Sequence, residues 1–333
     1  MTRLLKSDGR RLALRAVIAL ALLLIIVWVI DVRTVASAFQ GANAGWILAA
    51  VALLPINLLL ESEKWHLFLG AIGAGSSRAN TFASILAGYA IGVVTPLRVG
   101  DHVGRILYIT DRRKGSLLIL SLLDRVFSIW IYAVAGTLGM SYMLVNAAND
   151  PATAWWLTIA LGGLIVVGAG ILVFKPTLVS AAAGGIDRTS FFGRWVRRVQ
   201  WIDHLVPSIT LPALLLSALR FAVFSTQFVL LLMAFDVNAS ISSLYIGSAV
   251  VFFVKTVIPS ISLFDLGIRE SAAVLFFGFF GVAAGAAFSA SLLLFGVNIV
   301  LPALIGALVI PKLRLQWKTS RESSTSNLEA ETG

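Results

Sequence analysis

Four ionisable side chains after Pro96 are spaced as they would be on one face of an α-helix. They stand at i, i+3, i+4 and i+7 and are Arg98, Asp101, His102 and Arg105. Two guanidinium groups on one stripe can hold a phosphate bidentately, with Asp101 as the neutralising partner of the empty site. The structural alternative is an ion pair between Asp101 and Arg105 at an interface, with His102 as a bystander.

A second set of polar residues repeats this spacing inside an apolar run. Ser121, Asp124, Arg125 and Ser128 interrupt the sequence LLILSLLDRVFSIWIYAV. A charged side chain at bilayer depth costs roughly 2.5–3.5 kcal/mol on insertion scales, so the Asp–Arg pair must face protein or water rather than lipid. It can contact a substrate, or it can be a buried ion pair that fixes helix packing.

A third set surrounds the sequence VIPSISLFDLGIRE. It consists of Lys255, Ser260, Asp265, Arg269 and Glu270. Lys255 and Arg269 are candidates for binding an anion, with Glu270 as a counter-ion. Alternatively, Arg269 and Glu270 pair and cap the start of the following helix, while Lys255 extends to the membrane interface.

Motifs of common enzyme classes are absent from the sequence. It contains no HExxH, GxSxG, P-loop or GxGxxG motif and no acidic metal-ligand triad, and its three histidines are scattered. Asp101 and His102 are adjacent, so on a helix they point about 100° apart and cannot form a base–orienter pair. We therefore expect a protein that is not an enzyme and that binds no metal or cofactor.

The composition is that of an integral membrane protein. Apolar residues make up 59% and charged residues 13% of the 333, against about 45–50% and about 25% in soluble domains. Long apolar runs favour helices over an outer-membrane barrel. The net charge of +10 does not indicate nucleic-acid binding, because the basic residues lie at the ends of apolar runs, where they report topology and contact anionic lipids.

Six apolar runs are predicted to span the bilayer, at 12–30, 45–60, 116–145, 155–174, 214–235 and 286–310. Three other runs, 81–95, 244–258 and 271–280, are short, and the first would give only about 22 Å of helix against a core of about 30 Å. We interpret the first span as retained rather than cleaved, because the candidate signal-peptidase site at 36–38 lies too far from the apolar run.

The distribution of basic residues distinguishes between two possible membrane topologies of the chain. If every apolar run spans, the basic loop 175–211 and the basic C-terminal segment both face outward. If the short runs instead form re-entrant hairpins at about 81–108 and 244–280, six spans remain and both termini face the cytoplasm. The outer loops then hold a single basic residue, Arg33, of the 26 in the chain. The positive-inside rule therefore favours re-entry, in a bacterial inner (cytoplasmic) membrane.

The two predicted hairpins enter from opposite sides and are separated by about half the chain. Oppositely oriented broken elements that meet near the midplane are the architecture of transporters built from inverted repeats. The expected parts are one membrane domain 1–318 with half-repeats at about 1–175 and 207–318, an amphipathic cytoplasmic linker 176–206 and a disordered tail 319–333.

Four stretches resemble the lysylphosphatidylglycerol synthase transmembrane-region family of flippase-like membrane proteins. They are EKWHLFLG at 63–70, similar to RW-x-x-LL; TPLRVGDHVGR at 95–105, similar to P-x-R-x-GE-x-x-R; LLDRVFSI at 122–129, similar to ER-hydrophobic-x-D; and IPSISLFDLGIRESA at 258–272, similar to P-x-x-GG-x-G-x-REA. The resemblance implies a lipid-translocating membrane domain. It also implies polar positions of the family at Arg98, Asp101, Arg105, Asp124, Arg125, Arg269 and Glu270.

The chain departs from the family pattern in three places. Asp101 stands where Glu is usual, Ser128 replaces an acid, and the run Leu263-Phe264-Asp265 replaces a Gly-Gly pair and affects how tightly the second turn closes. We expect a stand-alone member without the aminoacyl-transferase domain of the longest relatives. Transfer of lysine to lipid is therefore not expected of this chain alone.

From these observations we expect a flippase that moves an anionic, phosphate-bearing lipid between the leaflets of the inner membrane. Arg98 and Arg105 would hold the head group from the cytoplasmic side, and Lys255 and Arg269 from the outer side. The full set of predicted substrate-binding residues is Arg98, Asp101, Arg105, Asp124, Arg125, Lys255, Arg269 and Glu270. The expected partners are membrane lipids, with a lipid-biosynthesis enzyme as a further candidate.

Two other classes of function stay open. A membrane-embedded transferase or hydrolase acting on a lipid would use an acid such as Asp101 as its base and would change the mass of the lipid. A non-transporting scaffold for a lipid-biosynthesis enzyme would tolerate Arg98→Ala and Arg105→Ala, whereas a transporter would not. The sequence does not indicate which lipid is bound.

Overall fold

The computed structural model describes residues 42–95, 98–109, 111, 113–147, 202–258 and 267–308, together with single positions between 152 and 170. Within these residues every regular element is a helix. The helices are α3 (Ala44–Ala52), α4 (Leu54–Ala71), α5 (Arg78–Gly92), α6 (Val99–Tyr108), α7 (Lys114–Ala147), α11 (Ile202–Met233), α12 (Ile241–Val257), α13 (Ile268–Gly278), α14 (Ala284–Phe295) and the π-helical turn η3 (Gly296–Val300). The expected all-α polytopic membrane fold is confirmed.

Four of the described helical stretches are long and apolar enough to cross a membrane, namely Ala44–Ala71, Lys114–Asn146, Ile209–Met233 and Ala284–Leu308. They coincide with four of the six spans predicted from the sequence. The predicted span 12–30 lies outside the described residues, and so does 155–174 apart from single positions. The tail 319–333 and most of the linker 176–206 also lie outside them, although α11 already begins at Ile202.

Helices α5 and α6 form a hairpin in which the two backbones touch. A Cβ atom on Gly104 would lie 2.6 Å from the carbonyl oxygen of Ala87, and one on Gly100 would lie 2.5 Å from that of Ile91. Neither position can therefore hold a side chain unless the backbone moves. The hairpin covers the predicted segment 81–108. With ten residues, α6 is about 15 Å long, which is too short to cross a bilayer.

The turn between α5 and α6 is shaped by Thr95 and Arg98. Thr95 Oγ1 accepts a hydrogen bond of 2.8 Å from the backbone N–H of Gly100, which satisfies a donor in the first turn of α6. Arg98, the residue before α6, has φ 54° and ψ 31°. This left-handed conformation costs a non-glycine residue about 1–2 kcal/mol. The intervening Pro96 lies outside the described residues.

The opposite end of this hairpin is tied to α4 and α7. Lys114 Nζ donates to the carbonyl oxygen of Ile106 at 3.0 Å, near the C-terminus of α6, where a cation is favourable. Arg113 donates to the carbonyl oxygen of Ile72, just after α4, at 2.9 Å. Its hydrogen bonds to the carboxylate of Asp111 lower the pKa of that group. These contacts place the α4–α5 and α6–α7 connections at the same end of the molecule.

Helices α12 and α13 form a second hairpin, which begins at Ile241, three residues before the predicted segment 244–280, and ends at Gly278. Before α13 begins, Gly267 has φ 108°, a conformation that suits glycine and strains other residues. The Glu270 carboxylate accepts a hydrogen bond of 2.7 Å from the backbone N–H of Gly267 and so caps the helix. The turn itself, with Ser260 and Asp265, lies outside the described residues.

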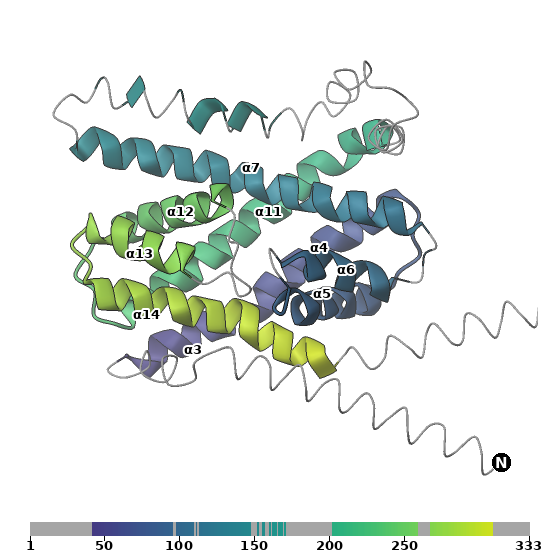
Figure 1. Ribbon diagram of the computed structural model, residues 1–333, viewed down its shortest axis with the longest axis horizontal. Coiled ribbons are helices and arrows are strands. Elements are labelled where there is room, and N and C mark those ends of the chain that lie inside the picture. The colour runs from purple at the N-terminus through teal and green to yellow at the C-terminus, as the bar shows by residue number, and fades with distance from the viewer. Residues whose placement is uncertain are drawn as a thin grey trace, which may run out of the picture.

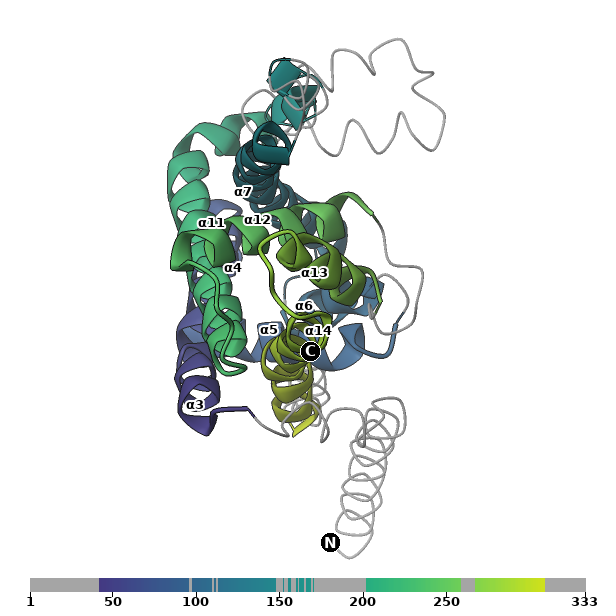
Figure 2. The ribbon, with the colours of Figure 1, turned by 90° about the vertical axis from the view of Figure 1, so that its left-hand side faces the viewer.

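The two hairpins lie at opposite ends of a frame of long helices. In Figure 1, α5 and α6 are on the right and α12 and α13 on the left, between α7 above and α14 below. Helix α11 crosses the frame diagonally and packs on α4, and Figure 2 shows the same frame turned by 90°. Each half thus contains a long helix, a hairpin and another long helix in that order. The two half-repeats and their inverted symmetry stay predictions.

Candidate functional site

The turn ends of both hairpins line one cavity. Arg98 and Asp101 from the start of α6 meet Lys255 from the end of α12 and Arg269 from the start of α13. Side chains of α4, α7, α11 and η3 complete the walls, and the cavity has a volume of about 210 Å³. The fold therefore brings charged residues of both halves of the chain to a common centre.

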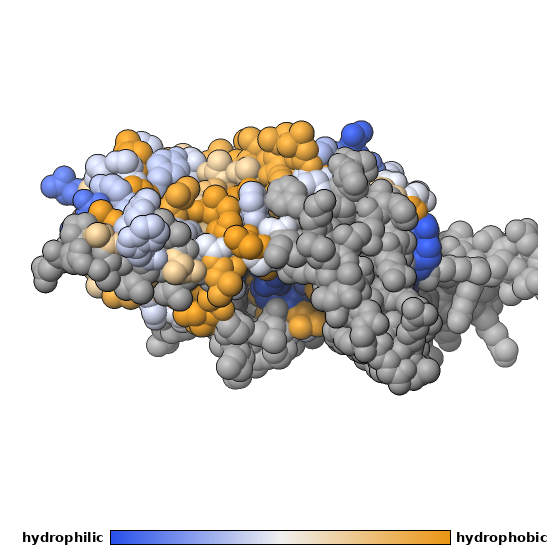
Figure 3. All heavy atoms as spheres, turned by 90° about the horizontal axis from the view of Figure 1, so that it is seen from above, coloured by the Kyte–Doolittle hydropathy of each residue, from blue (hydrophilic) through white to orange (hydrophobic). Residues whose placement is uncertain are grey.

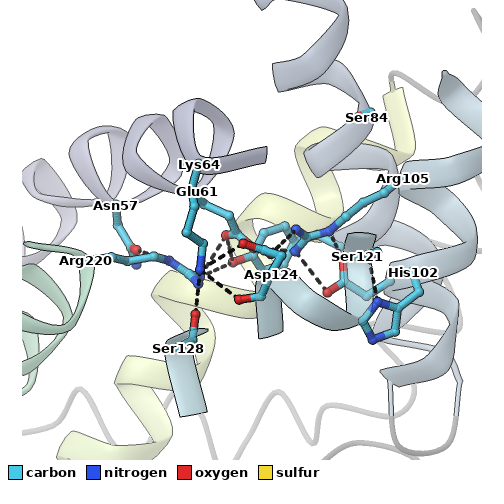
Figure 4. A network of polar contacts seen from close by, with 12 residues as sticks. Asn57, Glu61, Lys64, Ser84, His102, Arg105, Ser121, Asp124, Ser128 and Arg220 are labelled. Carbon is cyan, nitrogen blue, oxygen red and sulfur yellow. Dashed lines mark hydrogen bonds and ion pairs between the residues drawn. The ribbon is translucent and has the colours of Figure 1, made fainter. Parts of the chain in front are cut away.

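Arg105 is the centre of a buried ionic network beside this cavity (Figure 4). Its guanidinium contacts Asp101 on its own helix at 3.0 Å, Asp124 on α7 at 3.4 Å, and Glu61 on α4. The side chains of Arg105 and Glu61 are only 6% and 4% exposed. Because a buried charge without a partner costs several kcal/mol, these four side chains hold α4, α6 and α7 together as a unit.

Lys64 extends the network along α4. Its Nζ lies 2.9 Å from the carboxylate of Asp124. It also donates hydrogen bonds to the hydroxyl oxygens of Ser128 at 2.6 Å and Ser217 at 3.1 Å. An ammonium group has three donors, and these partners on α7 and α11 satisfy all of them. Lys64 therefore has no donor left for a ligand.

Arg220 on α11 extends the network in the other direction. Its Nη2 lies 2.8 Å from a carboxylate oxygen of Glu61, and its Nε donates to the side-chain oxygen of Asn57 at 2.9 Å. Tyr89 on α5 donates to the same Glu61 carboxylate at 2.7 Å. Asn57 in turn donates to Asn298 in η3 at 2.6 Å. The network thereby joins both halves of the fold.

This network is electrically balanced. Three acids face three bases, and each is within 3.4 Å of a partner of opposite charge. The members are Glu61, Asp101, Asp124, Lys64, Arg105 and Arg220. A balanced and hydrogen-bonded network is stable when buried without a ligand. We call this set of six the ionic network.

Two other arginines on the cavity wall, Arg98 and Arg125, have no carboxylate partner among the described residues. The Arg98 guanidinium lies 5.2 Å from the ring centroid of Tyr89, and its buried Nε has no hydrogen-bond acceptor. Arg125 on α7 is exposed and lines the same cavity. These two groups, unlike the ionic network, have free donors for an anion.

Arg269 reaches the cavity from α13 but already has partners. Its Nη2 lies 2.6 Å from Glu270 Oε1, and its Nε donates to Ser291 on α14 at 3.0 Å. Glu270 is not among the residues that line the cavity. Its carboxylate caps α13, as in the structural alternative for this pair, and its role toward a substrate stays a prediction.

One side of the cavity is apolar. Ile129 and Tyr132 of α7 line it together with Phe224 of α11 and Phe252 of α12. The two phenylalanine rings stack with their centroids 4.7 Å apart. Figure 3 shows hydrophilic atoms between hydrophobic side chains near the centre of one face. The cavity therefore offers basic groups and an aromatic surface to the same ligand.

The sequence as a whole fits a known family. Residues 13–306 match the family described as the lysylphosphatidylglycerol synthase TM region. The chain belongs to this family. The match includes all four stretches on which the resemblance rested, and it relates the chain to lipid metabolism or transport. No curated protein matches the chain.

In this member of the lysylphosphatidylglycerol synthase TM-region family, most predicted binding residues meet at one place. Seven of the eight line the cavity, and Glu270 is the exception. The seven are Arg98, Asp101, Arg105, Asp124, Arg125, Lys255 and Arg269. Contact with a substrate stays a prediction for each of them.

Three members of the site, Glu61, Lys64 and Tyr89, were not predicted from the sequence. Glu61 and Lys64 follow the predicted span 45–60 and would be expected at the membrane interface. They are instead 3% and 1% exposed, because α4 continues to Ala71. Their i, i+3 spacing puts both charges on one helical face, and this was the signal that could have identified them.

His102 also lines the cavity and has a hydrogen-bond partner. Its Nδ1 lies 2.6 Å from the hydroxyl oxygen of Ser121 on α7. Among the described residues there is no group of three or more His, Cys, Asp or Glu side chains that could hold a metal ion.

Proposed function

We propose that this chain is a lipid flippase, which moves an anionic lipid between the leaflets of the bacterial inner membrane. The observation that carries the proposal is one cavity with an aromatic wall and two arginines that form no ion pair with a carboxylate among the described residues. An anionic amphiphile needs both parts, since its phosphate is bound by arginine and its hydrocarbon packs on apolar side chains.

The two hairpins give the lipid head group access from both sides. Arg98 on the first hairpin would meet it from the cytoplasm, beside the carboxylates that Arg105 holds in place, and Lys255 and Arg269 on the second would meet it from outside. In this proposal both hairpins are re-entrant, both termini are cytoplasmic, and the halves are inverted repeats. Transporters of this architecture alternate by moving one repeat against the other around a fixed site.

The ionic network suggests how such a movement avoids leaving a charge without a partner. Arg105 contacts carboxylates from three helices at once. If α6 shifts against α4 or α7, Arg105 can release Glu61 or Asp124 while it keeps Asp101, which moves with it. Asp101 and Asp124 would thus serve as counter-ions that exchange partners as the site opens to alternate sides.

The proposal includes no chemical change of the lipid. The chain would act by relocation, and a lipid-biosynthesis enzyme could supply or use the lipid on one side. Since the sequence has no P-loop, transport would be driven by an ion gradient or by the supply of the lipid, or would only equilibrate the leaflets.

Purified protein in liposomes tests this function. The vesicles contain a fluorescent anionic phospholipid, and dithionite added outside destroys only the probes in the outer leaflet. The wild-type protein should make the inner-leaflet probes accessible faster than in protein-free vesicles, with the mass of the extracted lipid unchanged. Arg98→Ala and Arg125→Ala should slow this exchange. Arg78→Ala should not, because Arg78 forms an exposed ion pair with Glu63 away from the cavity.

The other functions predict different results in this assay. A change in the mass of the lipid would indicate a transferase or a hydrolase. Wild-type vesicles that equal protein-free vesicles would contradict transport and would leave the scaffold as the best explanation. Equal rates for Arg98→Ala, Arg125→Ala and Arg78→Ala would show that the cavity is not the route.

A further inference from the structure

Two arginines on the cavity wall, Arg98 and Arg125, differ from the other lining arginines because they form no ion pair with a carboxylate among the described residues. The ionic network is neutral as a whole, so it contributes no surplus charge. Arg269 is balanced by Glu270 at 2.6 Å. Lys255 also lines the cavity and has an interaction partner. Arg98 and Arg125 are the two lining arginines that form no ion pair with a carboxylate among the described residues, and each carries one positive charge.

Arg98, just before α6, and Arg125, on α7, reach the same cavity from different parts of the chain. Arg98 is fixed by its left-handed backbone and by its position over the Tyr89 ring. Arg125 extends from the middle of α7. Both line the cavity of about 210 Å³. Each guanidinium can donate two parallel N–H···O bonds to a phosphate, which is the bidentate geometry in which arginine binds this group most strongly.

Building on the function proposed above, we propose that the ligand is a lipid whose head group is a phosphate monoester with two negative charges, and that Arg98 and Arg125 bind this phosphate. A phosphodiester lipid carries one negative charge and would leave one guanidinium without compensation. At membrane depth such a charge is costly. A dianionic phosphate neutralises both arginines and supplies the acceptor that the Arg98 Nε lacks.

This assignment separates the binding residues from the positioning residues. Arg105 donates hydrogen bonds from its Nε and from both terminal nitrogens to the carboxylates around it. It therefore has little capacity for a phosphate and acts by holding Asp101 and Asp124 in place beside the two binding arginines. Phe224 and Phe252 would contact the apolar part of the same lipid.

Two matched lipids test the charge requirement. Phosphatidic acid has a phosphate monoester, and phosphatidylmethanol has a phosphodiester on the same dioleoyl chains. Binding to the purified full-length chain in detergent is measured by thermophoresis at about pH 8, where the monoester has lost its second proton. We expect phosphatidic acid to bind at least about tenfold more tightly than phosphatidylmethanol. The preference should fall toward about pH 5, where the monoester regains this proton.

Variants assign the preference to the two arginines. Arg98→Gln and Arg125→Gln should each bring the two lipids to similar affinity, whereas Arg78→Gln should keep the preference. Arg125 is exposed and has no ion pair among the described residues, so its variant is expected to fold even if Arg98→Gln does not. Equal affinity of the wild-type protein for both lipids, or a preference that survives Arg125→Gln, would overturn the proposal.

Inorganic phosphate is the third ligand in the binding experiment. It should bind far more weakly than phosphatidic acid, because it cannot contact the aromatic wall. Comparable affinity would mean that the ligand is a soluble phosphate and that the lipid assignment is wrong. Transport is scored separately in the liposome assay. Exchange of both lipids at one rate would reject the dianion requirement and keep the flippase, whereas selective binding without exchange would reject the flippase and keep the binding site.

Discussion

The ammonium group of Lys64 lies 2.9 Å from the carboxylate of Asp124, and the two side chains are 1% and 9% exposed. Removal of one partner leaves the other charge buried without full compensation, which typically costs about 3–5 kcal/mol. We therefore expect Lys64→Met to lower the free energy of unfolding by an amount in this range. Denaturant titration of the purified protein in detergent measures the loss.

An exposed ion pair provides the control for this substitution. Arg78 and Glu63 are 74% and 40% exposed at a distance of 3.0 Å, and Arg78→Met should cost at most about 1 kcal/mol. The double variant Lys64→Met/Asp124→Asn should lose less stability than the sum of its single variants. If the losses simply add, the two groups do not interact and the ion pair has no stabilising role.

The contact between α5 and α6 predicts a strong effect of one added methyl group. In Gly104→Ala the Cβ would lie 2.6 Å from the Ala87 carbonyl oxygen, so the helices must separate at a cost of about 1–3 kcal/mol or more. Gly115→Ala is the matched control, since nothing lies within 4 Å of its Cβ. There alanine should be neutral or stabilise the helix by up to about 1 kcal/mol. Equal melting temperatures for the two variants would contradict the close packing of the hairpin.

The spans and the stripe on α6 could be predicted because both depend on local pattern. Apolar runs report the length of a helix, and the spacing of Arg98, Asp101 and Arg105 reports one helical face. The position of Pro96 before these residues indicated where the helix begins. The sequence therefore contained enough information to place α6 and most of its charged residues in the site.

The partners of these residues could not be predicted, because they depend on tertiary packing. Glu61 meets Arg105 and Arg220, which are 44 and 159 positions away. No periodicity connects residues at such separations. For Glu270, the sequence allowed a cap and a substrate contact equally well. Only the position of its carboxylate on the Gly267 N–H, away from the cavity wall, distinguishes them.

The left-handed backbone of Arg98 predicts that two substitutions at this position differ in stability but lose lipid exchange equally. Arg98→Gly and Arg98→Ala both remove the guanidinium and its contact with Tyr89, but only alanine keeps a Cβ at φ 54°. The glycine variant should therefore be about 1 kcal/mol more stable than the alanine variant. Both should lose lipid exchange to the same extent. A glycine variant no more stable than the alanine variant would mean that the backbone at this position is not strained.

The absence of cysteine from the sequence makes the proposed topology directly measurable. Single cysteines at exposed Arg78 and Arg113 should be protected from an impermeant maleimide in intact cells, because the α4–α5 and α6–α7 connections lie at the same end of the molecule, which we propose to be cytoplasmic. A cysteine at exposed Ser240, just before α12, should react with the maleimide. The C-terminus of α11 lies beside the N-terminus of α3, where the Ala234 carbonyl accepts a hydrogen bond from the N–H of Asn43. This side of the molecule is opposite to the α4–α5 and α6–α7 connections. Detergent should make all three reactive. The reverse labelling pattern would mean that the protein has the opposite orientation in the membrane. Equal labelling of Arg78→Cys and Ser240→Cys before detergent is added would contradict hairpins that enter from opposite sides.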